Sequence, residues 1–390
     1  MPRHPSLAAS AQGLSDAVYS ALAARSGKAT GPIYPLHVGD TWLEPPPCAR
    51  AEAQRTADHP RLHNYAPVQG EPALLAAIRR RIFTRHGFDL DPACLQVMPG
   101  ATTGLAIVVA ALLDPGDELL LPSPFWPLIR GIVTTRGCRA VEVPFFTRLD
   151  EAGFDAEAAL ERAVTPRTAA LYVNTPHNPT GRVLPEPVVA AVARVARRHD
   201  LWVLADAAYE DLAYAAAAAP PLWLRADLAE RTIAVHTCSK SHALAGARVG
   251  WVHGPPGAMR AIRGVQTFNA YCASRPMQLG AARALEEGDA WQAEARRLYR
   301  EAGTAAATAL GLPPPEAGTF LFFDAAPFLG PGEQLDDFLL RCLDAGVLLT
   351  PGAAAGRDYA TWARLCFTAV TPEDLARALD RLTSVLRPRR

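Results

Sequence analysis

Seven short apolar runs, separated by segments of helical periodicity, are the feature that most limits how this chain can fold. Each run is rich in branched aliphatic residues. Such runs, alternating with helices, are typical of a mostly parallel sheet that is buried on both faces. The runs are Leu95–Met98, Glu118–Leu121, Ala140–Val143, Ala169–Val173, Leu201–Ala205, Thr232–His236 and Val249–Val252. The sequence therefore predicts an α/β protein with a seven-stranded, mostly parallel sheet in a large domain.

The carboxy-terminal part has a different pattern, with fewer and less apolar strands, and predicts a smaller α+β domain. We expect an interrupted helix at 276–310, strands at 319–324, 347–350 and 364–367, and helices at 335–345 and 372–386. The predicted division is an N-terminal segment of the small domain at 1–45, a large domain at 46–280 and a small C-terminal domain at 281–390.

The N-terminal segment contains three further expected elements. Leu14, Val18 and Leu22 have helical spacing and predict an amphipathic helix within residues 1–30. Ile33–Val38 predicts a strand. Pro45–Pro47 predicts a stiff connector at the crossing between domains.

Composition excludes several classes of partner. The 39 Lys and Arg residues balance the 39 Asp and Glu residues, so nucleic acid and anionic membranes are not expected as partners. The seven cysteines have no C-x-x-C spacing, and no histidines have metal-ligand spacing, which argues against a disulfide framework and a metal site. The first residues lack an apolar signal core. We therefore expect a soluble cytoplasmic protein.

Polar residues follow several of the expected strands where each strand ends. Asn178 lies beyond the fourth strand, Asp206 and Tyr209 follow the fifth, and Lys240 follows the sixth. Ligands of open α/β sheets bind beyond the carboxyl ends of the strands, so these side chains could form one site. The Gly100–Gly104 turn adds backbone N–H groups that could hold a phosphate at a helix start, although alone it is an ordinary tight turn.

Lys240 stands between two serines directly after a buried strand, in the stretch Thr237 to Gly250. A desolvated lysine amine readily shifts its pKa and is suited to Schiff-base chemistry. Taken alone, however, Lys240 could equally be a loop lysine that happens to follow a strand.

These motifs together resemble the class I/II aminotransferase family of fold-type I, pyridoxal-phosphate-dependent enzymes, which are similar to aspartate aminotransferase. The resemblance runs from Gly39 to the last helix. It is carried by Tyr65 with Gly70, Asn178-Pro179-Thr180-Gly181, Asp206 to Tyr209, Ser239-Lys240 to Arg248, and Arg364. It implies the fold-type I architecture, pyridoxal 5'-phosphate as cofactor, and transfer of an amino group between an α-amino acid and an α-keto acid.

The resemblance also implies roles for individual residues. Lys240 would hold the cofactor as a Schiff base and shuttle a proton, and Asp206 would pair with the ring nitrogen. Asn178 and Tyr209 would bind the phenolic oxygen, and Trp126 would stack on the ring, with Phe125 as the neighbouring alternative.

Two further groups follow from the same resemblance. The phosphate would be bound by Gly100, Ala101, Thr102, Thr237, Ser239 and Arg248. The substrate α-carboxylate would be bound by Arg364, with Gly39 and Asn178 beside it. Tyr65 and Ser274 would reach the phosphate of a neighbouring subunit, which implies a homodimer with shared active sites.

Four departures from the family pattern affect the substrate pocket rather than the cofactor. They are Ala207 after the aspartate, Ala353–Ala355 where a bulky aromatic is frequent, Trp42, and Arg275. Arg275 could bind a second substrate carboxylate, or it could be a structural residue paired with an acidic side chain, which is the interpretation we favour.

Two other functions remain open at this point. A lyase, decarboxylase or cyclase would use the same cofactor residues, because the chemistry is shared until Cα loses its proton. A non-enzymatic regulator with an aminotransferase fold is disfavoured, since no added DNA-binding domain is apparent.

Overall fold

The seven expected runs form one sheet with the strand order β1-β7-β6-β5-β4-β2-β3. The computed structural model describes residues 8–12, 14, 31–215 and 220–386. The strands are β1 (Leu95–Met98), β2 (Glu118–Ser123), β3 (Arg139–Pro144), β4 (Thr168–Asn174), β5 (Trp202–Asp206), β6 (Thr232–Thr237) and β7 (Gly250–His253). β7 runs antiparallel to β1 and β6, and the other neighbours are parallel. The predicted seven-stranded, mostly parallel sheet is confirmed.

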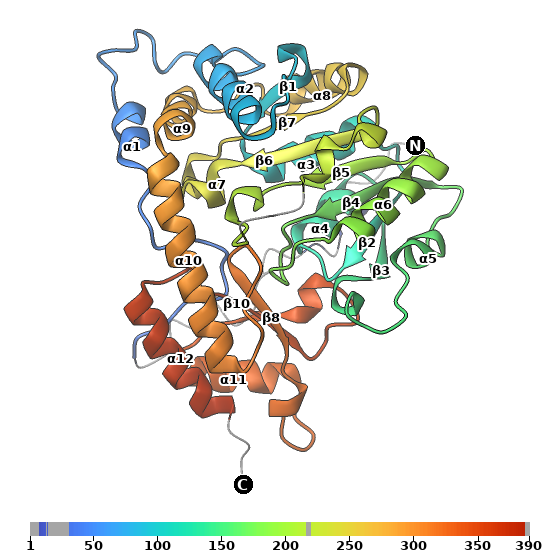
Figure 1. Ribbon diagram of the computed structural model, residues 1–390, viewed down its shortest axis with the longest axis vertical. Coiled ribbons are helices and arrows are strands. Elements are labelled where there is room, and N and C mark those ends of the chain that lie inside the picture. Colours follow the sequence, from blue (N-terminus) through green and yellow to red (C-terminus); the bar gives the residue numbers. More distant parts are fainter. Residues whose placement is uncertain (1–7, 13, 15–30, 216–219, 387–390) are drawn as a thin grey trace, which may run out of the picture.

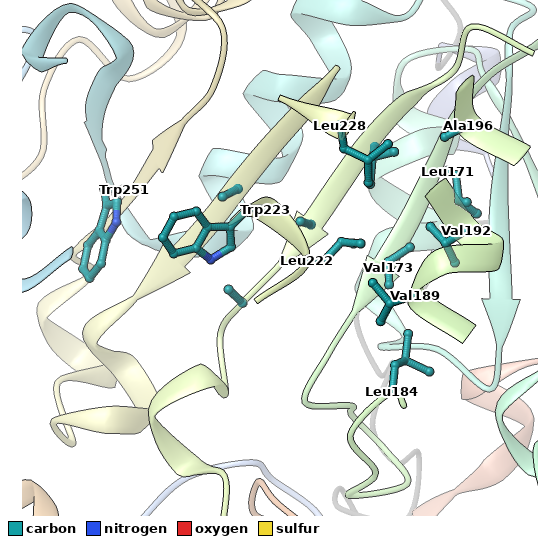
Figure 2. Packing of buried hydrophobic residues seen from close by; sticks show 14 of the residues in the cluster. Leu171, Val173, Leu184, Val189, Val192, Ala196, Leu222, Trp223, Leu228 and Trp251 are labelled. Atoms are coloured by element: carbon teal, nitrogen blue, oxygen red, sulfur yellow. The ribbon is translucent and has the colours of Figure 1, made fainter. Parts of the chain in front are cut away.

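Helices cover both faces of this sheet (Figure 1). The helices of this part of the chain are α1 (Pro47–Ala53), α2 (Pro72–His86), α3 (Gly100–Leu112), α4 (Leu128–Thr135), α5 (Ala156–Glu161), α6 (Glu186–Arg198), α7 (Cys238–Ser241), α8 (Pro256–Asn269) and α9 (Arg275–Glu287). Val192 of α6 lies with Leu171 and Val173 of β4 in one core cluster (Figure 2). Val108 of α3 and Leu204 of β5 belong to the cluster on the opposite face. Alternate residues of each strand therefore enter different cores.

Glycine and proline set several helix ends. α2 begins at Pro72, because the first N–H groups of a helix have no partner within the helix and a proline there loses no hydrogen bond. It ends at His86, and Gly87 follows it with φ 65°. The helix predicted at 276–310 is two helices, α9 and α10 (Asp289–Leu310), divided at Gly288. A Cβ on Gly288 would lie 2.3 Å from the carbonyl oxygen of Ala284, so only glycine fits this junction.

The carboxy-terminal part forms a second, smaller unit below the large sheet in Figure 1. Its antiparallel sheet has the order β8-β10-β9, and its helices pack against that sheet. The elements are β8 (Phe320–Asp324), α11 (Leu335–Asp344), β9 (Thr350–Pro351), β10 (Trp362–Cys366) and α12 (Pro372–Leu386). Tyr34 and Leu36 lie in the same core as Phe338 and Leu365, so this N-terminal stretch packs with the small unit. The domain boundaries at 1–45, 46–280 and 281–390 stay predictions, and the last one falls inside α9.

Several expectations for the connecting segments need correction. Ile33–Val38 is not a strand, because the Leu36 N–H donates back to the Tyr34 carbonyl oxygen at 3.0 Å in a tight turn centred on Pro35, whose fixed φ suits it. Only the single parallel bridge between Tyr34 and Val347 forms. The strand predicted at 347–350 is likewise only Thr350–Pro351. The proline connector is shorter than predicted, since Pro47 begins α1. The helix expected within residues 1–30 falls largely outside the described residues.

Candidate active site

A cavity of about 260 Å³ opens beyond the carboxyl ends of β4, β5 and β6, where segment 38–40 and strands β8 and β10 close over the large sheet. Most of the predicted site residues meet in its wall. Those that line it are Gly39, Ala101, Thr102, Trp126, Asn178, Asp206, Tyr209, Thr237, Ser239, Lys240, Arg248 and Arg364. Gly100 lies just behind this wall, and Tyr65 lies on the surface.

Lys240 projects into the cavity from the short helix α7, whose first turn is capped by the Thr237 hydroxyl. Its Nζ donates a hydrogen bond to the carbonyl oxygen of Gly39, which comes from the opposite wall. Burial lowers the pKa of the Lys240 amine, and the Asp40 carboxylate partly opposes this shift. A lowered pKa increases the unprotonated fraction, which is the nucleophilic form of the amine.

Asp206 ends β5 as a buried carboxylate, with 5% of its surface exposed. Its Oδ2 accepts a hydrogen bond of 2.5 Å from the Tyr172 hydroxyl, and its Oδ1 accepts one of 3.1 Å from the Ala208 N–H. Burial raises the pKa of Asp206 to about 6, and these two donors hold it lower than burial alone would. Both donors are neutral, so a protonated ring nitrogen fits this carboxylate as its cationic partner.

A chain of hydrogen bonds joins the two units across the cavity. Arg364 of β10 donates to Asn178 Oδ1 at 3.1 Å and to the His37 carbonyl oxygen at 2.9 Å. Asn178 Nδ2 donates to the Tyr209 hydroxyl at 3.3 Å. The Arg364 guanidinium also lies 4.3 Å from the centroid of the Phe320 ring. Arg364 is therefore buried and held in orientation, as bidentate recognition of a carboxylate requires.

The opposite end of the cavity has the donors of a phosphate site. The Thr237 and Ser239 hydroxyls lie 2.8 Å apart, beside Arg248 and the start of α3. A Cβ on Gly100 would lie only 2.5 Å from Arg248 Nη2, so glycine makes room for the guanidinium. Hydroxyl, guanidinium and helix N-terminal N–H donors suit a dianionic phosphate. Amine, buried carboxylate and phosphate donors together fit pyridoxal phosphate.

Three residues that the sequence did not single out also contribute. Tyr172 contacts Asp206 from β4, Asn174 Nδ2 donates to the Asp206 carbonyl oxygen at 3.0 Å, and Phe320 packs beneath Arg364. Tyr172 and Asn174 alternate along β4, so they share a face of the sheet. The alternation of these two residues could have indicated from the sequence that they share a face. Their pairing with Asp206 could not be predicted, because it depends on the register between β4 and β5.

The residues marked as departures from the family pattern lie outside the cavity wall. Ala207 faces the apolar core, and Trp42 and the Ala353–Ala355 segment do not line the cavity of the single chain. Arg275 pairs with Glu71 at 2.9 Å and donates to the Arg61 carbonyl oxygen, so it is a structural residue within the chain.

Of the two ring-stacking candidates, Trp126 lines the cavity. Phe125 is fully buried in the core and does not line the cavity, so Trp126 stays the predicted stacking residue.

Within the described residues, no cluster of three or more His, Cys, Asp or Glu side chains is arranged to hold a metal ion. No helix in the same part of the chain combines the length and apolar character needed to cross a bilayer.

Comparison with known proteins agrees with this site. The sequence pattern of the family described as aminotransferase class I and II matches residues 32–382. The chain belongs to this family, whose members depend on pyridoxal phosphate.

Two relatives and two structures illustrate the similarity. The probable N-succinyldiaminopimelate aminotransferase DapC of Mycobacterium tuberculosis is 38% identical over 244 residues, 61% of this chain and 60% of that protein. The chain thus aligns with about three fifths of that relative's length. The aspartate/prephenate aminotransferase of Thermus thermophilus is 33% identical over 346 residues, 86% of each protein.

A solved mutant structure of Thermus thermophilus aspartate aminotransferase has a TM-score of 0.88 and 28% identity, and the match covers 98% of this chain and 100% of that one. The solved N-succinyldiaminopimelate aminotransferase of Mycobacterium tuberculosis has a TM-score of 0.85 and 31% identity, with coverage of 94% and 96%.

Gly100→Ala should weaken cofactor binding at least about tenfold, because Arg248 must move and a charged hydrogen bond is lost. The affinity is measured by titrating cofactor-free protein with pyridoxal phosphate. Gly87→Ala is the matched control, since Gly87 also has a positive φ (65°) but no atom within 4 Å of an added Cβ. Equal affinities for the two variants would contradict the steric role of Gly100.

Proposed function

We propose that this protein is an aminotransferase that moves an amino group between an α-amino acid and an α-keto acid. The observation that carries the proposal is the meeting of three groups in one cavity, the Lys240 amine, the buried Asp206 carboxylate and the Arg364 guanidinium. Pyridoxal phosphate, when bound, supplies a ring that accepts the electron pair left on Cα. The protein's own residues bind and orient the reactants and move the proton.

Each residue has a proposed task. Arg364 binds the substrate α-carboxylate and so fixes the position of Cα. Lys240 Nζ takes the proton from Cα, for which a lowered pKa is suited. Asp206 keeps the ring nitrogen protonated, while Asn178 and Tyr209 bind the phenolic oxygen.

The relatives favour transamination over the lyase, decarboxylase or cyclase alternative. DapC and the Thermus thermophilus enzyme are named as aminotransferases, and so is an arginine–pyruvate transaminase of Pseudomonas aeruginosa, 34% identical over 77% of each protein. The three enzymes are named for different amino acids, but each name describes transfer of an amino group. Recognition of the α-carboxylate by Arg364 is the part of the site that such different substrates would share.

A half-reaction tests this function. Adding an α-amino acid to the holoenzyme should convert the bound cofactor from its aldehyde to its amine form and release one equivalent of keto acid. Screening amino acids by absorbance and product mass measures both. Keto-acid release without the amine form would instead indicate a lyase.

Arg364→Gln should slow this half-reaction by at least about thirtyfold, because truncating a buried charged partner costs about 2–5 kcal/mol. The same variant should react with the corresponding amine, which lacks the carboxylate, at about the wild-type rate. Exposed Arg357 provides the matched control as Arg357→Gln. If the rate falls equally with the amino acid and with the amine, Arg364 does not bind the substrate carboxylate.

We further propose that two copies of the chain form a homodimer with shared active sites. Tyr65, Phe268 and Tyr271 are exposed aromatic residues, at 82%, 92% and 44%. Tyr65 and Tyr271 are in edge-to-face contact with ring centroids 5.1 Å apart, and exposed Ser274 follows Tyr271 closely. Exposed apolar residues gathered in this way favour an interface between proteins, and the Tyr65 hydroxyl would there reach the phosphate of the second copy.

Mixing two defective variants tests the shared site. Lys240→Ala removes the amine of its own site, and Tyr65→Ala would weaken the site of the neighbouring subunit. A mixed dimer contains one site with both defects and one with neither, so mixing after brief unfolding should restore part of the activity. No recovery in mixed dimers, or a fully active monomer by sedimentation velocity, would contradict this arrangement.

We also propose a cytoplasmic location. All seven cysteines lie in the described part of the chain and none forms a disulfide, which suits a reducing compartment.

A further inference from the structure

Tyr172 occupies a position on β4 that places its side chain on the same face of the sheet as Asp206. Leu171 and Val173 point toward α6 (Figure 2), so Tyr172 between them points to the opposite face. In the register of β4 and β5, Tyr172 lies opposite Leu204, and Asn174 lies opposite Asp206. Tyr172 is thus the diagonal neighbour of Asp206, at a separation that an aromatic side chain can span.

The Asp206 carboxylate is bound by protein donors and also borders the cavity. Tyr172 and the Ala208 N–H bind it from the protein, and the carboxylate also lines the cavity. Tyr172 is only 2% exposed and is not part of the cavity wall. Its hydroxyl therefore acts on the cofactor only through Asp206.

In this hydrogen bond Tyr172 is the donor and the Asp206 carboxylate is the acceptor. Burial, and then the Asp206 carboxylate, raise the pKa of Tyr172 well above its ordinary range, so its phenol stays protonated and donates. The hydrogen bond in turn lowers the pKa of Asp206. The other ionisable groups that line this cavity are Asp40, Tyr209, Lys240, Arg248 and Arg364.

We propose that Tyr172 is a positioning residue that keeps the Asp206 carboxylate ionised and aimed at the cofactor's ring nitrogen. Without this donor the carboxylate would attract the shared proton more strongly, and the proton would move from the ring nitrogen toward Asp206 Oδ2. The inference rests on the proposed function only for the identity of the cofactor. It does not depend on which reaction follows.

The test measures the protonation of the ring nitrogen directly, in resting holoenzyme without substrate. Wild type, Tyr172→Phe and Tyr359→Phe are loaded with pyridoxal phosphate labelled with nitrogen-15 on the ring, and the nitrogen NMR signal is recorded at neutral pH. Phenylalanine keeps the ring that fills the core and removes only the hydroxyl. Tyr359 is the matched control, because it is also buried and its hydroxyl binds Thr147 at 3.1 Å rather than Asp206.

In Tyr172→Phe the signal should move toward the unprotonated value, with the proton-sharing equilibrium changed about tenfold, as loss of one charged hydrogen bond predicts. Tyr359→Phe should match wild type. A Tyr172→Phe signal at the wild-type position would overturn the proposal and leave Tyr172 as core packing.

If Tyr172→Phe does not fold, a protein with 3-fluorotyrosine at position 172 tests the proposal instead. This residue keeps the shape of tyrosine, and its hydroxyl is a stronger hydrogen-bond donor. The nitrogen signal of this protein should keep the protonated value to a higher pH than in wild type, and a pH dependence equal to that of wild type would overturn the proposal. Since no substrate is present, failure of the half-reaction and failure of this test are separate outcomes.

Discussion

The parallel alignment of β4, β5 and β6 is the constraint on which the site depends. Parallel neighbours end at the same edge, so the residues after these three strands meet without any local sequence signal joining them. Asn178, Asp206 and Lys240 come from these three strand ends and line one cavity. Burying a carboxylate there has a cost, and the Tyr172 and Ala208 donors offset part of it. The cofactor's ring nitrogen would offset the rest.

The small unit completes the site rather than merely covering it. Arg364 reaches from β10 to Asn178 of the large sheet and to the carbonyl oxygen of His37 in the N-terminal stretch. Lys240 reaches in the other direction to the carbonyl oxygen of Gly39. The two units therefore meet through the same residues that we expect to bind substrate.

The sequence predicted the large sheet well, because each strand is a separate apolar run whose type does not depend on its neighbours. It also predicted most of the cavity wall, since the resemblance was carried by residues in fixed positions. It failed where structure depends on a single proline, as at Pro35, or on pairing over long separations, as at 347–350. Tyr172 was missed for the latter reason, because its partner lies 34 residues away on the next strand.

The central claim is that Lys240 is the residue to which the cofactor is attached, and chemical trapping tests it most directly. Purified holoenzyme is reduced with borohydride, digested and mapped by mass spectrometry, with Lys240→Ala as the control. The account predicts a single pyridoxyl group on the peptide that contains Lys240, and none in the variant. A group on another lysine, or no covalent attachment in the wild-type protein, would contradict the account.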